Sequence, residues 1–288
     1  MKQHSIVIIG CGDIGVELGG RLHRLGHKVY GVRRSPEKLP EFIQGIGADY
    51  MNEADLKQQL AQVAADYVVV TLTPATFTAE AYQQCFGEGT RNILAALSIV
   101  PPRRLLYVSS TGVYHQADGE WVDEDSATEP HQFSGENILA AEKEVLSSSS
   151  PATIVRFGGI YGPGRLRLIK QLQAGGAITA SWNFSNRIHR DDCAGMLGHL
   201  LLLDAQGAVI DDCYVGVDSE PVPLQEVQRY LAQCMGLNPA VAAETTRQRG
   251  GNKRCSNKRI VASGFEFEYP SYREGYEAVL LAEGLIAP

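Results

Sequence analysis

Long hydrophobic runs are missing from this chain. The longest candidate spans residues 196–203, and it is interrupted by Gly198 and His199. A helix that crosses a membrane needs about 20 consecutive apolar residues, so the sequence predicts no membrane span. The N-terminal residues 1–9 reach Gly10 too soon to contain the apolar core of a signal peptide. We therefore expect a cytoplasmic chain with no membrane partner.

Closely spaced cysteines are also missing. The six cysteines are scattered along the chain without a close pair: Cys11, Cys85, Cys193, Cys213, Cys234 and Cys255. Zinc sites and disulfide scaffolds both need cysteines at short, regular spacings, so neither is expected and no metal is predicted. A reducing cytosol suits such thiols, and each is expected to pack as a small apolar side chain.

The chain also has no excess of positively charged residues. The chain has 26 Lys and Arg residues against 33 Asp and Glu residues, which gives a net charge of −7. An acidic chain is a poor general binder of nucleic acid, so we expect no such partner, and a DNA-associated regulator is the weakest function considered. The composition, with 44% hydrophobic and 20% charged residues, is that of an ordinary globular protein. Its length of 288 residues suits one or two domains.

The first half of the chain alternates short apolar runs with amphipathic patterns. Strands are expected over residues 5–9, 28–32, 48–50, 67–72, 104–109 and 153–157, and helices over residues 14–25, 56–63, 77–97 and 138–146. Strands separated by helices imply right-handed crossovers and an open parallel sheet with helices on both faces, the doubly wound α/β fold. Ligands bind beyond the carboxyl ends of the strands in such a sheet, so the residues just after each strand are site candidates.

The second half is less regular. Helices are expected near residues 166–172, 191–203, 224–235 and 273–282, and strands near residues 186–189 and 213–217. No low-complexity linker separates the halves. A boundary near residue 155 is therefore soft, and we expect two parts that interleave.

A glycine-rich turn follows the first expected strand and opens the first expected helix. It runs Gly10, Cys11, Gly12, Asp13, Ile14, Gly15. The first glycine permits a tight turn, the second lets the backbone approach a pyrophosphate, and the third allows close packing of helix on strand. Free N–H groups and the positive dipole end at the start of a helix favour an anion there. The pattern predicts a dinucleotide site, and the alternative is a plain tight turn.

The second expected strand ends in Arg33, Arg34 and Ser35. NAD sites usually carry an acidic residue here for the ribose hydroxyls, whereas a guanidinium matches the 2′-phosphate that distinguishes NADP. We interpret Arg33, helped by Arg34 or Ser35, as a preference for NADP over NAD. The alternative is a solvated surface pair.

Five further segments fall where the sheet argument places ligands. They are residues 71–74 (TLTP), 89–94 (GTRNIL), 107–114 (YVSSTGVY), 156–165 (RFGGIYGPGR) and 186–192 (NRIHRDD). Together they resemble the extended short-chain dehydrogenase/reductase superfamily, the NAD(P)-dependent epimerase/dehydratase group, and most closely its atypical YeeZ-like branch. The resemblance covers almost the whole chain.

The resemblance implies a Rossmann domain, residues 1–155, that binds NAD(P), and a smaller substrate region, residues 156–288, partly interleaved with it. It implies reversible hydride transfer to a nicotinamide, often on a nucleotide-linked sugar, carried by a Ser or Thr, a Tyr and a Lys. Ser110 matches the hydroxyl position and Thr111 lies beside it. The cofactor contacts implied after the later strands are Thr71, Leu72, Thr73 and Ser109.

The family's Tyr–Lys pair, spaced four residues apart, has no match at the expected helix start. One alignment places Phe133 and Asn137 there, and another places Ser134 and Ile138. Phenylalanine cannot transfer a proton, and asparagine cannot depress the pKa of a neighbour by charge. Either another group is the acid/base, or the chain binds NADP without turnover as a redox sensor or scaffold. The candidates for a replacement acid are Tyr114, His115, Tyr161 and His189.

An anionic substrate is expected in the C-terminal part. Arg165 and Arg187 could grip a phosphate or carboxylate, with Tyr161 and His189 nearby, and the alternative for each arginine is a structural salt bridge. Residues 245–265 contain no acidic residue and six cations: Arg247, Arg249, Lys253, Arg254, Lys258 and Arg259. Localised positive charge concentrates anions, although a solvated loop would look the same. A homodimer through residues 77–97 and 138–146 would follow the habit of the resembling family.

Overall fold

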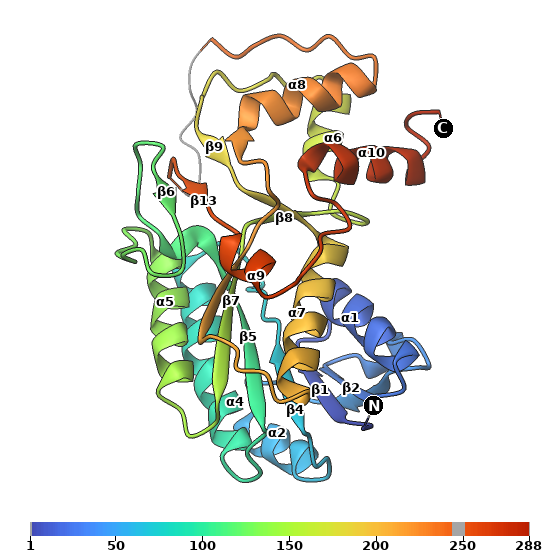
Figure 1. Ribbon diagram of the computed structural model, residues 1–288, viewed down its shortest axis with the longest axis vertical. Helices are drawn as coiled ribbons and strands as arrows, with labels where there is room; N and C mark the ends of the chain where they lie inside the picture. The colour runs from blue at the N-terminus through green and yellow to red at the C-terminus, as the bar shows by residue number, and fades with distance from the viewer. Residues whose placement is uncertain (1, 244–250, 288) are drawn as a thin grey trace. The chain divides into compact units, whose positions relative to one another are not determined.

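The computed structural model describes residues 2–243 and 251–287 (Figure 1). The chain divides into two compact units. Unit 1 comprises Met1–Val113, Thr128–Arg156 and Ala194–Tyr214, and unit 2 comprises Tyr114–Ala127, Phe157–Cys193 and Val215–Pro288. Each unit therefore gathers segments that lie far apart in the sequence.

A seven-stranded sheet forms the centre of the α/β fold. Its spatial order is β11-β7-β5-β4-β1-β2-β3, and the pairs around β1, β2, β3, β4 and β5 are parallel. The strands are β1 (Ser5–Ile9), β2 (Lys28–Arg33), β3 (Gln44–Gly47), β4 (Tyr67–Val70), β5 (Arg104–Ser110), β7 (Ala152–Phe157) and β11 (Cys213–Gly216). All four residues of β4 are buried, as expected for a strand covered on both faces. The predicted doubly wound Rossmann fold is confirmed.

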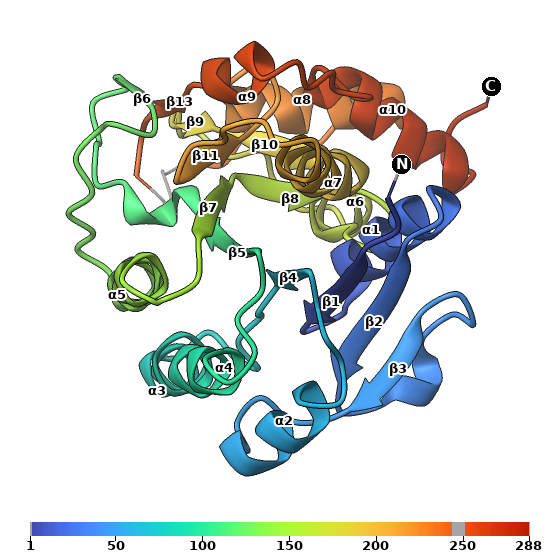
Figure 2. The same cartoon turned by 60° about the horizontal axis from the view of Figure 1, so that its bottom comes forward.

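Helices cover both faces of this sheet. Figure 2 shows α1 (Asp13–Arg24) and α7 (Arg190–Ala205) on one face, and α4 (Gly89–Leu97) and α5 (Phe133–Leu146) on the other. Unit 1 also contains α2 (Glu53–Leu60), α3 (Ala79–Tyr82), the π-helical turn η2 (Gln83–Glu88) and the short 3-10 turns η1 (Pro36–Lys38) and η3 (Thr111–Val113). The expected helix over residues 77–97 is thus present, interrupted by a π-helical turn of the kind that often marks a functional region.

Three elements of unit 1 are shifted by three or more residues from their predicted positions. Helix α2 was predicted at residues 56–63 and lies at Glu53–Leu60, because Asn52 caps a polar first turn that carries no apolar pattern. Glycine explains the other two shifts. The third strand was predicted at residues 48–50 and lies at Gln44–Gly47, because a strand rich in glycine carries little β signal. A Cβ on Gly45 would approach the Pro36 Cβ to 2.8 Å, so a glycine is needed at this contact. Helix α5 was predicted to begin at residue 138 and begins at Phe133. Its first turn includes Gly135, a poor helix former that hides the pattern.

The described part of unit 2, which leaves out residues 244–250 and 288, is built from short strand pairs and four helices. Parallel pairs join β8 (Gly159–Tyr161) to β10 (Arg187–His189) and β6 (Trp121–Val122) to β13 (Arg254–Cys255), and an antiparallel pair joins β9 (Phe184–Ser185) to β12 (Val222–Pro223). The helices are α6 (Arg167–Gln173), α8 (Leu224–Cys234), α9 (Lys258–Ala262) and α10 (Tyr272–Ala282). The two-residue strands and α9 carried no periodic signal in the sequence, because such short segments do not repeat a pattern.

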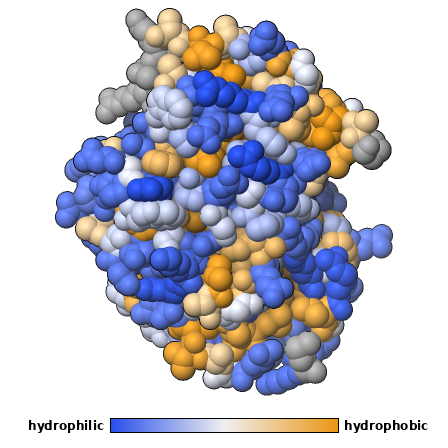
Figure 3. Space-filling view, turned by 45° about the horizontal axis from the view of Figure 1, so that its top comes forward, coloured by the Kyte–Doolittle hydropathy of each residue, from blue (hydrophilic) through white to orange (hydrophobic). Residues whose placement is uncertain are grey.

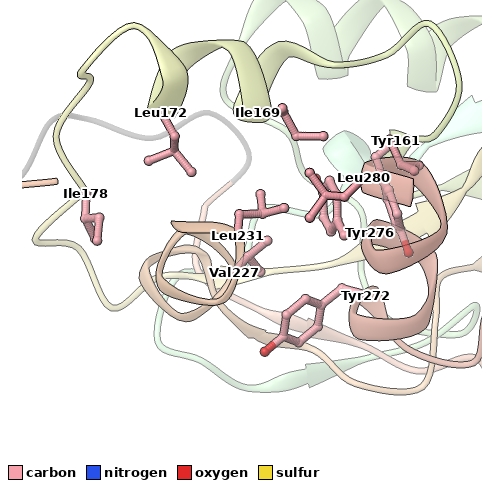
Figure 4. Close-up of a cluster of buried hydrophobic side chains, with 10 residues drawn as sticks. Tyr161, Ile169, Leu172, Ile178, Val227, Leu231, Tyr272, Tyr276 and Leu280 are labelled. Atoms are coloured by element: carbon pink, nitrogen blue, oxygen red, sulfur yellow. The ribbon is translucent and has the colours of Figure 1, made fainter. Parts of the chain in front are cut away.

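The core of unit 2 lies between α6, α8 and α10 (Figure 4). It contains Tyr161, Ile169, Leu172, Ile178, Val227, Leu231, Tyr272, Tyr276, Val279 and Leu280. Tyr161 and Tyr276 stack with ring centroids 4.1 Å apart. The Tyr161 hydroxyl donates to the main-chain oxygen of Ser271 at 3.4 Å. A large aromatic is therefore seated against the N-terminal turns of α10.

Gly275 makes room for Tyr161. A Cβ at position 275 would lie 1.9 Å from the Tyr161 Oη and 2.7 Å from its Cζ. We expect Gly275→Ala to lower the free energy of unfolding by about 1–3 kcal/mol, because overpacking displaces the ring. Urea denaturation measures the loss. Adding Tyr161→Phe, which removes the nearest atom, should restore part of it, and the exposed Glu277→Ala on the same helix is the matched control. Equal stability of Gly275→Ala and Glu277→Ala would contradict this packing.

A buried histidine pair makes the stability of unit 1 depend on pH. His4 and His27 are each 5% exposed, and their ring centroids lie 5.7 Å apart. The His4 main-chain N–H donates to His27 Nδ1 at 3.2 Å, so that nitrogen must be unprotonated. Burial, and secondly the charge of His4, lower the pKa of His27 from its usual 6.5.

The sign of the effect follows from proton uptake. Because the folded pKa of His27 lies below the unfolded value, the unfolded chain binds more protons in acid, so stability is full above about pH 6.5 and decreases as the pH falls through the folded pKa. His27→Asn keeps an acceptor for the His4 N–H and removes the titrating group. Urea denaturation at about pH 7.5 and about pH 5 should show a smaller acid loss in the variant than in the wild type. An equal acid loss in both would contradict this assignment, since the other titrating pair nearby, His4 Nδ1 and Asp66 Oδ2 at 3.4 Å, remains in both.

The cysteines, the helices and the surface can be compared with what the composition predicts. None of the six cysteines, all of which lie in the described part of the chain, forms a disulfide, and Cys11, Cys85, Cys193 and Cys255 are buried as predicted. Within residues 2–243 and 251–287, none of the helices has the length and apolar character needed to cross a membrane. Hydrophilic residues cover most of the face in Figure 3, with hydrophobic residues in smaller groups between them.

Candidate functional site

The glycine-rich turn adopts a conformation that requires its first glycine. Gly10 has a φ of +75°, and a Cβ there would lie 2.7 Å from the main-chain oxygen of Thr71. The Thr71 hydroxyl donates to the Gly10 oxygen at 2.9 Å, and the Gly12 N–H donates to the same oxygen at 2.7 Å. The turn after β1 is therefore tied to the end of β4.

The other two glycines of the turn have different surroundings. A Cβ on Gly12 would have its nearest neighbour 3.7 Å away, so the space beside this N-cap residue of α1 is open. A Cβ on Gly15 would lie 2.9 Å from Ile8 Cγ2 and 3.1 Å from Cys11 Sγ. Gly15 thus allows α1 to pack closely on β1, while Gly12 leaves room for a ligand at the helix N-terminus.

A pocket of about 470 Å³ opens at the carboxyl ends of β1, β2 and β4. Eight of the predicted cofactor residues line it: Gly10, Gly12, Arg33, Arg34, Ser35, Thr71, Leu72 and Thr73. The register explains why they meet, since Ile9 lies opposite both Val32 and Val70 and the three strands end together. This is the edge of the sheet at which the fold places ligands.

The pocket is positively charged on the side of β2. Arg33 Nη1 donates to the Cys11 oxygen at 3.4 Å, and Arg34 and Lys38 also line the pocket. No Asp or Glu of residues 2–243 and 251–287 belongs to its lining. Burial raises the pKa of the Cys11 thiol to about 12, so it stays uncharged. Such a set can bind a phosphate through charge-assisted hydrogen bonds.

Sequence reasoning missed Lys38, Ala48 and Tyr50 in this lining. Lys38 ends the 3-10 turn η1, whose Pro36 at the first position directs the chain after Ser35. A proline just after the Arg-Arg-Ser segment was a signal for such a turn. Tyr50 lies beyond β3 and donates its hydroxyl to Cys85 Sγ at 3.7 Å. It could not be placed while β3 was predicted four residues too late.

The other predicted cofactor residues lie outside this lining. Asp13 is the exposed first residue of α1, and Ile14 is 5% exposed in the core. The Ser109 hydroxyl donates to Glu142 Oε1, and Glu142 is paired with Arg156 at 2.6 Å. Ser109 and Glu142 are buried, so the Ser109 hydroxyl serves this internal ion pair.

Ser110 and Thr111 lie beside the start of α5 within unit 1. A Cβ on Gly135, in the first turn of α5, would lie 2.6 Å from the Gly112 oxygen, so the helix directly abuts the turn that follows Ser110. Ser110 Oγ accepts from the Gly112 N–H at 3.0 Å. Thr111 is 8% exposed.

In the first two turns of α5, positions 133 and 137, or 134 and 138, are the ones compared with the Tyr–Lys pair of the resembling family. None of these four positions holds a tyrosine or a lysine. The Phe133 ring packs against Phe77 at 5.1 Å and Tyr82 at 5.4 Å. Asn137 Nδ2 donates to the Phe133 oxygen at 2.7 Å, and Ile138 is buried. Ser134, the remaining candidate position, is partly exposed.

The four candidates for a replacement acid all belong to unit 2. Tyr114 is 2% exposed and donates its hydroxyl to the Asp123 oxygen at 2.7 Å, whereas the next residue, His115, is partly exposed. Tyr161 is 1% exposed, and burial raises its pKa far above the usual value, which keeps its proton in place. His189 is also 1% exposed and lies against Tyr161 with centroids 5.4 Å apart. Its Nδ1 accepts from the Asp191 N–H at 3.2 Å.

A second pocket, of about 640 Å³, lies wholly within unit 2. Three predicted substrate residues line it, namely Tyr161, Arg165 and Arg187. Other side chains in the lining were missed: Ile160, Arg167, Leu168, Gln171, Ala177, Thr179, Leu224, Gln228, Ala242 and Tyr276. They come from β8, α6, α8, α10 and two loops, and only the tertiary fold brings them together.

The basic C-terminal segment makes its contacts within unit 2. Lys253 is 3% exposed and donates to the Tyr114 oxygen at 3.4 Å, and burial lowers its pKa. The Arg254 guanidinium lies 5.0 Å from the Trp121 ring centroid and 5.1 Å from that of Phe184. Of the other cations, Arg259 pairs with Glu124 and Asp125, Lys258 is exposed, and Arg247 and Arg249 lie outside the described residues.

Comparison with known proteins agrees with this geometry. A family model described as NAD(P)H-binding matches residues 10–201, a range that begins at the first glycine of the turn. A solved structure from Methylobacillus flagellatus, described as an NAD-dependent epimerase/dehydratase, is 38% identical, covers 98% of this chain and 100% of its own, and superposes with a TM-score of 0.85.

More distant proteins share the fold over nearly the full length. The 3-diazoavenalumate denitrifying reductase of a Streptomyces species is 25% identical over 94% of this chain and 98% of the reductase. The UDP-glucose 4-epimerase of Thermus thermophilus, solved in complex with NAD, is 17% identical, covers 96% of this chain and 97% of its own, and has a TM-score of 0.82. The glycine-rich turn lines the pocket of unit 1, and the family model matches two thirds of the sequence. The chain therefore belongs to the NAD(P)H-binding family, as an atypical extended short-chain dehydrogenase/reductase.

Proposed function

We propose that the chain is an NADP-dependent oxidoreductase, or an epimerase/dehydratase-like enzyme, that acts on an anionic small molecule such as a nucleotide-linked sugar. The observation that carries the proposal is the pocket of unit 1, where the glycine-rich turn and the cations after β2 face one space. When bound there, the nicotinamide cofactor supplies a hydride acceptor or donor.

The preference for NADP rests on charge. Arg33, Arg34, Ser35 and Lys38 offer donors where an NAD site has a carboxylate, and none of the described residues that line the pocket is acidic. Each charge-assisted hydrogen bond to a phosphate contributes about 1.5–3 kcal/mol. The carboxyl group of an NAD-type site would instead repel a 2′-phosphate.

The anionic substrate rests on the pocket of unit 2. Three arginines, Arg165, Arg167 and Arg187, line it. His189 packs beneath it against Tyr161 and supports the pocket wall. Guanidinium groups bind carboxylates and phosphates bidentately, which orients as well as holds a substrate.

Catalysis is assigned to Ser110, Thr111, Tyr114 and His115. We propose that the hydroxyls of Ser110 and Thr111 position the reacting oxygen of the substrate, and that His115 or Tyr114 exchanges the proton in place of the family's tyrosine. The segment compared with the Tyr–Lys pair supplies Phe133 and Asn137 or Ser134 and Ile138. His115 is the more accessible of the two acid/base candidates.

NADPH consumption tests the proposal. Purified full-length chain is assayed with carbonyl compounds that carry a carboxylate or phosphate, and with nucleotide-linked sugars. We expect turnover with at least one anionic substrate and a fall in kcat of about 100-fold or more in Ser110→Ala, because general acid/base geometry contributes 10²–10⁴-fold. Ser98→Ala, at an exposed serine after α4, is the matched control. Undiminished turnover in Ser110→Ala would contradict the assignment.

A catalytically silent NADP-binding regulator or redox sensor is the second candidate. The packing of Phe133 in an aromatic cluster, at a position where the family would use a tyrosine, favours it. Bound cofactor whose redox state never changes with any compound of the panel, in a chain that binds NADPH tightly, would support this candidate over the first.

The cellular setting is part of the proposal. Six cysteines that form no disulfide among the described residues suit the reducing cytoplasm. A homodimer would form through the face of α3, α4 and α5, near which Phe77 is 41% and Leu146 is 46% exposed. Light scattering on the purified chain distinguishes a dimer from a monomer.

A further inference from the structure

The pocket of unit 2 combines three arginines with several uncharged polar side chains and has no acidic residue among its described lining. Its volume of about 640 Å³ is that of a small-molecule site. Its polar side chains come from Arg165, Arg167, Arg187, Gln171, Thr179, Gln228, Tyr161 and Tyr276. Which of their atoms are still available decides what the pocket can bind.

Gln228 is locked in one orientation. The main-chain N–H of Thr179 donates to Gln228 Oε1 at 2.8 Å, and because an N–H can only face an acceptor, the oxygen of the amide must be the atom turned toward it. Gln225, one turn earlier on α8, donates its Nε2 to the Thr179 oxygen at 3.0 Å. The Thr179 peptide is thus held on both sides. What Gln228 retains for a ligand is its NH₂ group, a pair of donors.

Arg187 is oriented and remains charged. Its Nε donates to Ser185 Oγ at 2.7 Å and its Nη1 to Tyr276 Oη at 3.3 Å, which leaves three of the five guanidinium N–H groups. Tyr276, as acceptor of that bond, retains its hydroxyl hydrogen. Asp218 is 1% exposed, and its main-chain N–H donates to the Arg187 oxygen at 2.6 Å, but no ion pair joins the two side chains among the described residues. Burial raises the pKa of Asp218 to about 8, so near neutral pH it does not cancel the charge of Arg187.

Of the other two hydroxyls in the lining, that of Tyr161 is committed as a donor to the Ser271 oxygen, whereas that of Thr179 is not. Thr179 Oγ1 accepts from the Ser181 N–H at 3.2 Å and so retains its hydrogen as a donor. Gln171 is the single side-chain amide in the lining whose carbonyl is uncommitted, and it is exposed at the pocket's edge on α6. Apart from the Tyr161 oxygen, the side chains of the interior therefore offer mainly donors and positive charge. A nucleobase or a neutral sugar carries N–H or O–H donors that would find few acceptors here, and unpaired buried donors are costly.

We infer that this pocket binds a group made only of acceptor oxygens with at least two negative charges, either a phosphate or a cluster of carboxylates, and that Gln228 is a specificity-determining residue for it. This inference deepens the proposed function. Binding of the oxyanion does not depend on that function, but the role of the oxyanion as part of the substrate rests on it. A nucleotide-linked compound would place its phosphates here, and not its base. The shared chemistry of phosphates and carboxylates is the oxyanion.

Calorimetric titration of the NADPH-saturated full chain tests this inference. The probes are pyrophosphate, citrate, uridine and glucose. We expect pyrophosphate or citrate to bind at least about tenfold more tightly than uridine and glucose. The tighter of the two anions distinguishes a phosphate site from a carboxylate site. Binding of uridine or glucose as tightly as both anions, or no binding of either anion, would overturn the inference.

Gln228→Glu gives the sharpest variant. It preserves shape and the acceptor for the Thr179 N–H, but it replaces the donor group with a carboxylate oxygen. We expect anion affinity to fall at least about tenfold. Gln233→Glu, at an exposed position on the same helix, makes the same charge change away from the pocket and should leave affinity unchanged. Equal affinities in the two variants, with equal melting temperatures, would overturn the role of Gln228.

Arg187→Gln provides a second test if Gln228→Glu does not fold. It should weaken anion binding while NADPH affinity, measured in the same samples, stays at the wild-type value. Anion binding without turnover of any substrate would sink the proposed enzyme function and leave this pocket inference standing. Turnover of uncharged substrates only, without binding of either anion, would support an enzyme function and overturn the pocket inference.

Discussion

Gly12→Ala is expected to weaken binding of NADPH and NADH by at least about 100-fold while leaving the melting temperature unchanged. The added methyl group would have no protein atom within 3.7 Å, so the fold accepts it. The same space lies at the N-cap of α1, where the backbone must approach the pyrophosphate closely. A methyl group there keeps the anion from the N–H groups, each of which contributes about 1.5–3 kcal/mol to a charged acceptor. Calorimetric titration and thermal melting of one preparation measure both quantities.

Gly15→Ala is the matched control for this prediction, three residues along the same turn. Its Cβ would lie 2.9 Å from Ile8 Cγ2, so the cost falls on the packing of α1 against β1. We expect it to lower the free energy of unfolding by about 1–3 kcal/mol. Full cofactor affinity in Gly12→Ala would mean that the ligand does not lie over this turn.

Arg33→Ala is expected to raise the Kd for NADPH by about 10–100-fold and to change the Kd for NADH by less than about threefold. The guanidinium of Arg33 lines the cofactor pocket and is held by the Cys11 oxygen at 3.4 Å. Its loss removes charge-assisted hydrogen bonds of about 1.5–3 kcal/mol to the 2′-phosphate. Those bonds have no counterpart in NADH.

The discriminating quantity is the ratio of the two dissociation constants. Arg103→Ala, at an exposed arginine outside the pocket lining, should leave the ratio at the wild-type value. Lys38→Ala tests the cation that only the structure placed in the pocket. An equal loss of NADH and NADPH affinity in Arg33→Ala would show that the residue supports the turn and does not recognise a phosphate.

The sequence predicted the architecture because its strongest signals are local. The apolar run over residues 67–72 predicts a buried strand without reference to the rest of the chain, and the turn from Gly10 to Gly15 predicts a dinucleotide site in the same way. The order of strands and helices then limits the fold to a doubly wound sheet. Eight predicted cofactor residues meet in one pocket because β1, β2 and β4 end in register.

What could not be predicted depends on tertiary contacts. Nothing in the sequence connects Ser109 with Glu142, which lie 33 residues apart, so a hydroxyl used by an internal ion pair resembles a ligand contact. Gln228 is an ordinary helical glutamine until the Thr179 N–H is found opposite its side chain. Strand β3 was misplaced because Gly45 and Gly47 conceal it, and Tyr50 was lost with it.

The central claim is that the pocket beyond β1, β2 and β4 holds a nicotinamide dinucleotide, with NADP preferred. Calorimetric titration of the wild-type chain with NADPH and NADH tests it most directly. The account predicts saturable binding of one NADPH per chain, at least about tenfold tighter than NADH. Absence of heat with both cofactors in a folded preparation, or tighter binding of NADH, would contradict it.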